Sequence, residues 1–358
     1  MARPLPSGGA VHKLLVFKSC CIGDVLFSTP SVRALRKAFP LAEVVYLVGD
    51  WSRDVAGMIP RVDRVIRFPE PARPLALLRL LLALRRERFD LAVSFHRSAS
   101  AHALLALAGI PVRAGFDWKG SGRWLTHPAP FDEKAHEVRR YFAVLAALGV
   151  EPDGESTEIA APPAERESAA VMLGASGVPE GKRLAVIFPG GGRNPGTVMM
   201  SKRWTPLGWN AVARWLAGER GFSVAVVGDS SEKDLAVRVL EGVPGGVSLA
   251  GRTDLKGLAG IISHAAWFAG VDSGPTHMAA ALGVPTLTVF GPTDPRLVAP
   301  PGATNSFVWR KIDCAPCYEP GTVHSRRFLE CRDHKCLQEL PAENVLTVAR
   351  EQLDRMGI

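Results

Sequence analysis

The sequence lacks any run of about 18 or more consecutive apolar residues, so we expect no helix that crosses a membrane. Its first residues are not typical of a signal peptide, because their apolar part, 14–17, is short and leads directly into a strand-like pattern. The phosphate-loop signature GxxxxGKS/T is also missing, which excludes a phosphate site of that type. We therefore expect a cytoplasmic protein, with the inner face of the cytoplasmic membrane as an alternative location.

The chain of 358 residues carries a formal charge of +8, which is a moderate excess for its length. Lys and Arg outnumber Asp and Glu by 22 to 17 in residues 1–165 and by 21 to 18 in the remainder. A charge this spread out favours an anionic substrate or a membrane surface over a nucleic-acid partner. Hydrophobic residues make up 47%, enough for the cores of two ordinary domains.

Short apolar runs alternate with helical patterns along the chain, and the alternation restarts at 184–188 after a linker-like stretch at 151–167. This rhythm predicts an α/β fold with two Rossmann-like, doubly wound domains that face each other across a cleft. We place the domains at 1–165 and 166–341. The helical pattern in 342–358 is expected to pack back toward the N-terminal domain.

The most informative stretch is 265–295, AAWFAGVDSGPTHMAAALGVPTLTVFGPTDP. It predicts a buried strand, a polar turn, a short apolar helix and a second buried strand. The amides and side chains of Thr276 and His277, at the start of that helix, would bind an anion. Asp272 would accept hydrogen bonds from the hydroxyl groups of a sugar. The structural alternative is a capped helix start in which Asp272 bonds to local amides.

A glycine-rich loop leaves the first strand of the second domain, with the sequence PGGGRNPGTVMMSKRW. Consecutive glycines let a backbone approach a ligand closely, and the basic pair near the end of the loop supplies positive charge for phosphates. The spacing of the glycines fits the dinucleotide pattern GxGxxG poorly. The candidate residues in this loop are Gly190, Gly191, Gly192, Lys202 and Arg203.

Three further loops follow predicted strands and carry polar candidates. Glu232, shortly after Gly228, could bind a ribose diol or serve as the carboxylate of a capping box. Asp24 could act as a general base on an acceptor hydroxyl, or could be a carboxylate that the helix dipole favours. His96 and Arg97 could contact an anionic acceptor, and a structural role is the alternative for His96.

Two more features have a functional and a structural interpretation. The helix predicted at 74–88 is rich in Leu and Arg, so it could lie on an anionic membrane surface or simply pack its leucines on the sheet. Four cysteines near the C-terminus could bind zinc or an iron–sulfur cluster, although the second pair is spaced CxxxxC and not CxxC, and the alternative is a set of reduced thiols that stabilises a loop. We expect no metal and no cofactor. These cysteines are Cys314, Cys317, Cys331 and Cys336.

Taken together, the motifs resemble glycosyltransferase family 9, the ADP-heptose:lipopolysaccharide heptosyltransferases. The opening LLVFKSCCIGDVLFSTPSVRALRKAFP, the loop FPGGGRNPGTVMMSKRWTP and the D-S/T-G-x-x-H pattern in GVDSGPTHMAAALGVPTLTVFGPTDP carry the resemblance. It implies a GT-B fold with the donor in the C-terminal domain. It also implies inverting, metal-independent transfer from an ADP-sugar to a hydroxyl of a lipid-linked glycan. The NPG insert and the pair Cys20–Cys21 depart from the pattern of that family.

The resemblance also implies individual roles. Asp24 falls on the base, Lys202 on the lysine that binds donor phosphate, and Asp272 on the aspartate that contacts the donor sugar. The expected partners are ADP-heptose and an anionic lipid-linked glycan such as the lipopolysaccharide core, with peripheral contact to the inner membrane and no nucleic acid. A non-catalytic nucleotide-sugar-binding protein and a GT-B nucleotide-sugar epimerase are the alternatives. The other donor residues are Gly190, Gly191, Gly192, Gly228, Glu232, Ser273, Gly274, Pro275, Thr276 and His277.

Overall fold

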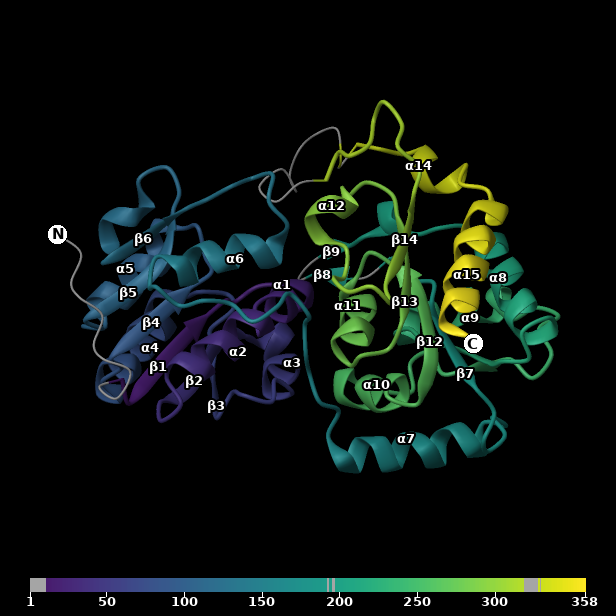
Figure 1. The fold of residues 1–358 in the computed structure, drawn as a ribbon, viewed down its shortest axis with the longest axis horizontal. Coiled ribbons are helices and arrows are strands. Elements are labelled where there is room, and N and C mark those ends of the chain that lie inside the picture. The colour runs from purple at the N-terminus through teal and green to yellow at the C-terminus, as the bar shows by residue number, and fades with distance from the viewer. Residues whose placement is uncertain (1–10, 192, 195–196, 319–327, 329) are drawn as a thin grey trace. The chain divides into compact units, whose positions relative to one another are not determined.

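The structure is a computed structural model that describes residues 11–358 apart from 192, 195–196, 319–327 and 329. The chain divides into two compact units, Met1–Ile159 and Ala160–Ile358 (Figure 1). The boundary precedes the predicted one because α7 (Pro163–Ala175) packs against α10 (Leu255–Ile262) and so belongs to the second unit.

The N-terminal unit is built on one parallel sheet. Its strands are β1 (Lys13–Phe17), β2 (Glu43–Gly49), β3 (Arg64–Phe68), β4 (Leu91–Ser94), β5 (Val112–Asp117) and β6 (His127–Pro130). Its helices are α1 (Ile22–Phe27), α2 (Thr29–Ala38), α3 (Arg53–Gly57), α4 (Pro74–Glu87), α5 (Ala99–Leu107) and α6 (Glu137–Ala146). The strand order is β3-β2-β1-β4-β5-β6. Strands are added toward one edge of the sheet from β1 to β3 and toward the other edge from β4 to β6. The order therefore reverses between β1 and β4, and a ligand crevice is expected at the carboxyl ends of these two strands.

The C-terminal unit repeats this topology. Its strands are β7 (Leu184–Phe188), β8 (Arg193–Asn194), β9 (Thr197–Val198), β10 (Ser223–Val226), β11 (Val247–Ser248), β12 (Ala265–Val271), β13 (Thr286–Phe290) and β14 (Ser306–Trp309). Its remaining helices are α8 (Pro206–Gly218), α9 (Lys233–Val239), α11 (Gly274–Ala281), α12 (Pro295–Val298), α14 (Lys335–Gln338) and α15 (Ala342–Met356). The main sheet has the order β11-β10-β7-β12-β13-β14, so the reversal lies between β7 and β12.

Helices cover both faces of each sheet, and this explains why the central strands are apolar without alternation. Figure 1 shows α10 and α11 on one face of the C-terminal sheet and α8, α9 and α15 on the other. All residues of β7 and β13 are buried, as are Leu14 to Phe17 of β1. The predicted doubly wound α/β architecture is therefore confirmed in both units.

The last helix is part of the C-terminal unit, where α15 packs on α8 and β14. The expected packing of 342–358 toward the N-terminal domain stays a prediction. Gln352, fully buried, accepts a hydrogen bond from the indole of Trp267 and donates to the carbonyl of Thr286. The apolar face of α15 is thus part of the C-terminal core.

Local differences from the predicted elements have clear causes. The helical pattern of residues 25–39 forms parts of two helices, because Ser28 bonds to Val25 and Tyr46 and because Pro30 lies in the first turn of the second helix. The strands β6 and β14 were not predicted, since both are half-exposed edge strands and β6 contains two prolines. Within the described residues, none of the helices has the length and apolar character needed to cross a membrane.

Candidate functional site

The polar centre of the C-terminal unit lies where the loops after β7 and β12 meet. The ammonium group of Lys202, on the glycine-rich loop, lies 2.6 Å from a carboxylate oxygen of Asp272. The two side chains are only 12% and 7% exposed. The sequence predicted both residues, and the sheet topology explains their meeting, because β7 and β12 flank the reversal of strand order.

Asp272 and Lys202 each have one further neighbour. His277 Nε2 lies 3.4 Å from its other carboxylate oxygen, and the Lys202 ammonium sits 4.5 Å from the ring centroid of Tyr318. Burial by itself raises the pKa of Asp272, but the charge of Lys202 and the hydrogen bond from His277 outweigh burial and lower it. Asp272 is therefore a carboxylate at neutral pH, and it can accept hydrogen bonds from hydroxyl groups.

The start of α11 differs in detail from the prediction. The His277 amide donates to the carbonyl of Ser273 at 3.2 Å, so it is not a free donor. The hydroxyl of Thr276 is fully buried and donates to the carbonyl of Val271, so this side chain is not a ligand donor either. The intrahelical bonds of a helix begin with its fourth amide and Pro275 has none, which leaves the amides of Gly274 and Thr276 as candidates.

Glu232 packs against Gly190 of the glycine-rich loop. Its carboxylate accepts from the amide of Asp229 at 3.0 Å in a capping box and pairs with Arg203 at 3.1 Å. Burial raises the pKa of Glu232, partly opposed by the Asp229 amide. The capping-box alternative is thus confirmed, and a ribose contact stays a prediction, because a carboxylate has further lone pairs.

Three glycines around Glu232 and the glycine-rich loop pack closely against neighbouring atoms. A β-carbon on Gly190 would overlap the carboxylate of Glu232, and one on Gly228 would come within 2.8 Å of it. A β-carbon on Gly191 would overlap the backbone carbonyl of Met199. Glycine is therefore required at Gly191, and a side chain at Gly190 or Gly228 would displace the Glu232 carboxylate. Gly192 lies outside the described residues.

Arg203, next to Lys202, adds a second cation to the glycine-rich loop. Its buried Nε has no hydrogen-bond partner among the residues that the structure describes, while its terminal nitrogen pairs with Glu232. A buried guanidinium nitrogen of this kind is costly unless a ligand or water satisfies it. An anionic group near Arg203 and Lys202 would meet both cations.

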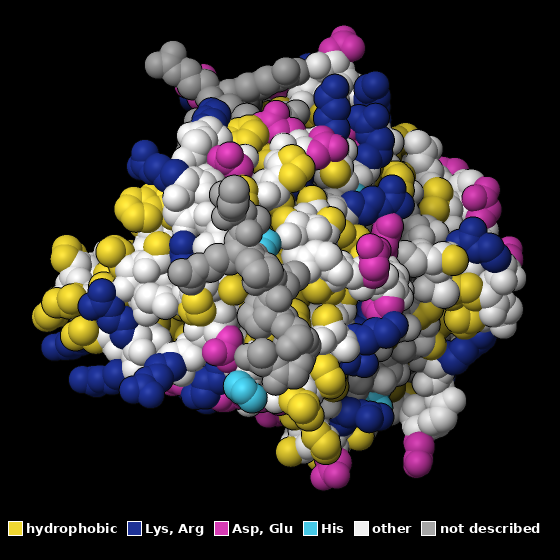
Figure 2. Space-filling view, turned by 60° about the vertical axis from the view of Figure 1, so that its left-hand side comes forward, with side chains coloured by type: hydrophobic (Ala, Val, Ile, Leu, Met, Phe, Trp, Pro, Cys, Tyr) yellow, Lys and Arg dark blue, Asp and Glu magenta, His cyan; other side chains and the backbone are white. Residues whose placement is uncertain are grey.

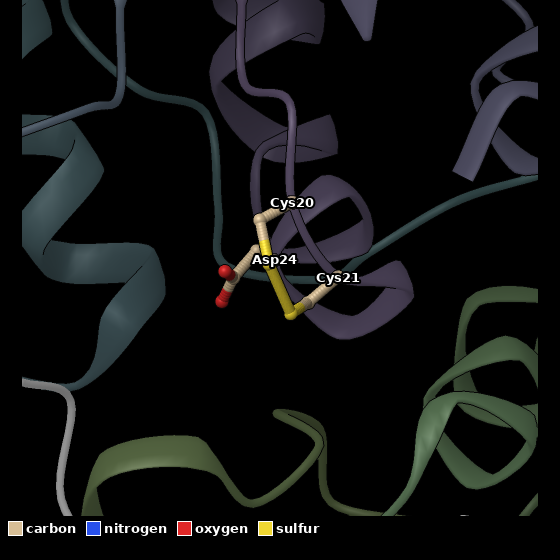
Figure 3. A group of neighbouring side chains, drawn as sticks. All are labelled: Cys20, Cys21 and Asp24. Carbon is tan, nitrogen blue, oxygen red and sulfur yellow. A yellow bond between two sulfur atoms is a disulfide. The ribbon is translucent and has the colours of Figure 1, made fainter. Parts of the chain in front are cut away.

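The polar centre of the N-terminal unit lies after β1. Asp24 is in the first turn of α1, and its carboxylate lies 3.3 Å from the ammonium of Lys18. Figure 3 shows this carboxylate beside the sulfur atoms of Cys20 and Cys21, which are bonded to each other. Asp24 is part-exposed, so a hydroxyl can reach it.

His96 and Arg97 follow β4, on the other side of the strand reversal. His96 Nε2 accepts a hydrogen bond from the amide of Ser19 at 2.9 Å. Burial, with the charge of Lys18, holds the pKa of His96 well below its ordinary value, so the ring is neutral. His96 therefore positions the loop that leads to Asp24, as the structural alternative predicted. The Arg97 guanidinium stacks on Phe131, with 4.9 Å to the ring centroid.

The C-terminal cysteines are free thiols in this structure. Burial raises the pKa of Cys336 to about 11, and the neighbouring thiols of Cys317, Cys314 and Cys331 add to the effect. Across the described residues, the one group of three or more ligand side chains with ligand atoms within 4.8 Å of one another is Cys20, Cys21 and Asp24. The thiols of Cys314, Cys317 and Cys331 thus lie near Cys336, and whether the four bind a metal stays open.

Sequence reasoning missed two members of these centres. Tyr318 was not singled out, because a lone Tyr beside CAPC gives no local signal for a partner over a hundred positions away. Lys18 was not singled out either, although a basic residue just after a buried strand and before an acidic helix start is a usable signal.

Comparisons with known proteins agree with this geometry. The sequence profile described as glycosyltransferase family 9 (heptosyltransferase) matches residues 77–325. The chain is 28% identical to lipopolysaccharide heptosyltransferase 3 of Escherichia coli, over 76% of this chain and 81% of that protein. It is 25% identical to lipopolysaccharide heptosyltransferase 1 of Pseudomonas aeruginosa, over 94% and 96%.

The fold agrees as well. The solved structure of the E. coli heptosyltransferase WaaC with ADP superposes with a TM-score of 0.71 at 22% identity and covers 95% of this chain and 99% of that one. The two doubly wound units are thus those of a GT-B protein. With a profile match over more than half of its length, the chain belongs to glycosyltransferase family 9, the heptosyltransferases, and is a glycosyl-transferring enzyme.

Proposed function

We propose that this enzyme transfers heptose from ADP-heptose, with inversion, to a hydroxyl group of the lipopolysaccharide core or a similar cell-surface glycan. The observation that carries the proposal is the buried Lys202–Asp272 pair at the carboxyl ends of β7 and β12. It offers a cation for a diphosphate and a carboxylate for sugar hydroxyls. The relatives' names, lipopolysaccharide heptosyltransferase 3 and 1, and the WaaC structure with ADP support the choice of donor.

The C-terminal unit would bind the donor. The ammonium of Lys202, the guanidinium of Arg203 and the amides of Gly274 and Thr276 would face the diphosphate, whose negative charge grows as the glycosidic bond breaks. Preorganised donors of this kind are usually the largest catalytic contribution. Asp272 would accept hydrogen bonds from heptose hydroxyls, and Glu232 would contact the ribose diol.

The N-terminal unit would bind the acceptor, and Asp24 would be the general base. The carboxylate takes the proton of the acceptor hydroxyl as the oxygen attacks the anomeric carbon. The bond from that carbon to the diphosphate oxygen breaks, and ADP leaves on the opposite face. Lys18, 3.3 Å from Asp24, fixes the orientation of the carboxylate. Arg97, on its aromatic platform, would contact an anionic group of the acceptor.

We also propose a peripheral contact between α4 and the cytoplasmic membrane, where such an acceptor is anchored. Leu80 and Leu84 of α4 are buried on the sheet, as an ordinary layer helix requires. Leu75, Leu78 and Leu82 are 60%, 51% and 42% exposed, so the helix has a second, unpartnered apolar face.

Basic side chains surround that apolar face. The exposed arginines of this region are Arg73, Arg79, Arg85, Arg86 and Arg88. Figure 2 shows hydrophobic side chains next to Lys and Arg on this side of the molecule. Exposed leucines among arginines suit an interface of acyl chains and anionic headgroups. The partner that this charge favours is therefore a bilayer with anionic phospholipid.

The experiment that tests the proposed function is a donor panel. The enzyme is incubated with a heptose-deficient lipopolysaccharide core and with ADP-heptose, UDP-sugars or GDP-sugars, and nucleotide release and acceptor mass are followed. We expect ADP release matched by addition of one heptose to the acceptor. Turnover of ADP-heptose without acceptor would favour the epimerase alternative, and binding without any turnover would favour the non-catalytic binding protein.

A further inference from the structure

The loop between β1 and α1 holds a compact group of three side chains that bind metals in other proteins. The sulfur atoms of Cys20 and Cys21 and a carboxylate oxygen of Asp24 all lie within 4.8 Å of one another. Cys20 is exposed, and Cys21 and Asp24 are part-exposed, so ions in solution can reach the group. Figure 3 shows the carboxylate beside the two sulfur atoms.

The chemistry of this donor set fits one class of ion. Two thiolates and a carboxylate are ligands of Zn²⁺ and similar thiophilic cations, and water can fill the fourth position. With metal–sulfur bonds of about 2.3 Å and metal–oxygen bonds of about 2.0–2.2 Å, tetrahedral ligand atoms are roughly 3.5 Å apart. Small side-chain rotations would bring the three groups from their present spacing to that one.

The two sulfur atoms are bonded in this structure, so binding needs the reduced form. A dithiol reductant supplies two electrons and two protons, which turn the disulfide into two thiols while the reductant becomes a disulfide. The cation then replaces the two thiol protons, which go to solvent, and forms two metal–sulfur bonds. The Asp24 carboxylate exchanges the Lys18 ammonium for the cation.

Hydrogen bonds donated by backbone amides hold the loop in place. The Ser19 amide donates to His96, and the Val25 amide donates to the carbonyl of Cys21 at 3.1 Å. Cys21 has φ of 55°, a region that favours glycine, yet the position carries a thiol. Local backbone geometry alone therefore gives no reason for cysteine at this position.

We propose that reduced Cys20 and Cys21, together with Asp24, bind a thiophilic divalent cation of the Zn²⁺ type, and that the bound cation takes the Asp24 carboxylate away from the acceptor hydroxyl. Binding would thus inhibit transfer. The inhibitory half of this inference rests on the proposed role of Asp24 as the general base.

The test is a titration of the full chain, reduced with dithiothreitol and then freed of it, with Cd²⁺ as a spectroscopic stand-in for Zn²⁺. Thiolate-to-cadmium absorbance in the ultraviolet reports each occupied thiol site. We expect the variant Cys20→Ser/Cys21→Ser to bind one equivalent less than the wild type. The matched control Cys314→Ser/Cys317→Ser removes another cysteine pair and should keep the equivalent that depends on Cys20 and Cys21.

Inhibition is measured in parallel with Zn²⁺. We expect saturating Zn²⁺ to lower wild-type turnover by roughly 10²–10⁴-fold, the range that general-base catalysis contributes. Cys20→Ser/Cys21→Ser should turn over without added metal and resist Zn²⁺. Equal Cd²⁺ absorbance in the wild type and in this variant would overturn the site, and equal inhibition of both would overturn the mechanism.

The two proposals fail separately. If the enzyme proves inactive with every donor, the proposed function fails, while the difference in Cd²⁺ absorbance between the wild type and the cysteine variant still decides the site. If Asp24→Asn retains full turnover yet binds Cd²⁺ more weakly than the wild type, the general base is wrong and the metal site stands.

Discussion

The ammonium nitrogen of Lys202 lies 2.6 Å from a carboxylate oxygen of Asp272, and the pair joins the loops after the two strands that flank the strand reversal of the C-terminal sheet. Both side chains are largely removed from water. Each charge therefore depends on the other in the absence of a ligand, and a diphosphate would share the cation.

Lys202→Met removes the cation and keeps the aliphatic stem. We expect kcat/KM for ADP-heptose to fall by roughly 10²–10³-fold, the usual effect of losing one preorganised donor to a developing charge. Stability should fall by about 3–5 kcal/mol, because Asp272 would stay buried without its partner. Kinetics and urea unfolding measure the two effects.

The control is Lys182→Met, at an exposed lysine of the same unit, which should change neither the kinetics nor the stability. Unchanged ADP affinity in Lys202→Met would contradict the donor site.

Gly190→Ala tests the packing of the glycine-rich loop on Glu232. A β-carbon at Gly190 would overlap the Glu232 carboxylate, so we expect a loss of about 1–3 kcal/mol in stability and weaker nucleotide binding. The matched control is Gly218→Ala, because its β-carbon would meet no atom within 4 Å. That variant should be neutral or slightly stabilising. Equal thermal midpoints for the two variants would mean that the loop does not rest on Glu232.

The pH dependence of stability tests the role of His96. Its pKa is held below the ordinary 6.5, chiefly by burial, so the folded ring resists protonation. As pH falls through about 6.5, the unfolded chain takes up a proton that the folded chain does not, and stability falls by up to roughly 1.4 kcal/mol per pH unit. His96→Gln keeps an acceptor for the Ser19 amide and should lose this component. The free energy of unfolding is measured with urea between pH 7.5 and pH 5. An equal fall of this free energy with pH in the wild type and in His96→Gln would contradict the assignment.

The α4 surface predicts binding to anionic membranes. Leu75→Ser/Leu78→Ser should weaken sedimentation with vesicles of phosphatidylglycerol, and Arg79→Gln/Arg86→Gln should make the remaining binding less sensitive to salt. Leu41→Ser, at a leucine that is 80% exposed outside α4, is the control. Equal sedimentation with neutral phosphatidylcholine vesicles would exclude a role for the arginines.

Much of the architecture could be predicted from the sequence, because buried parallel strands such as β7 and β13 are short apolar runs bounded by glycine and polar turns. The edge strands could not, since His127–Pro130 carries two prolines and its pairing depends on β5. Register and pairing at an edge are set by tertiary contacts, and a propensity pattern does not contain them.

The candidate site divides in the same way. Asp272 stands directly after a predicted strand, and Asp24 and Lys202 lie in the segments that follow predicted strands, so the topology brings all three to the carboxyl edges of their sheets. Two contacts around these residues could not be predicted. The ring of Tyr318 beside Lys202, and the hydrogen bond from the Ser19 amide to His96, depend on the directions of side chains. The buried hydroxyl of Thr276 shows the limit most clearly, since its hydrogen bond to Val271 turns an expected ligand donor inward.

The most direct test of the central claim is the turnover of Asp24→Asn with ADP-heptose and acceptor, measured beside its ADP-heptose affinity. We expect turnover to fall by roughly 10²–10⁴-fold with unchanged donor affinity, because the variant loses only the group that accepts the proton. Asp54→Asn, another carboxylate in the first turn of a helix, should behave as the wild type. Near-normal turnover of a folded Asp24→Asn would contradict general-base catalysis by this residue.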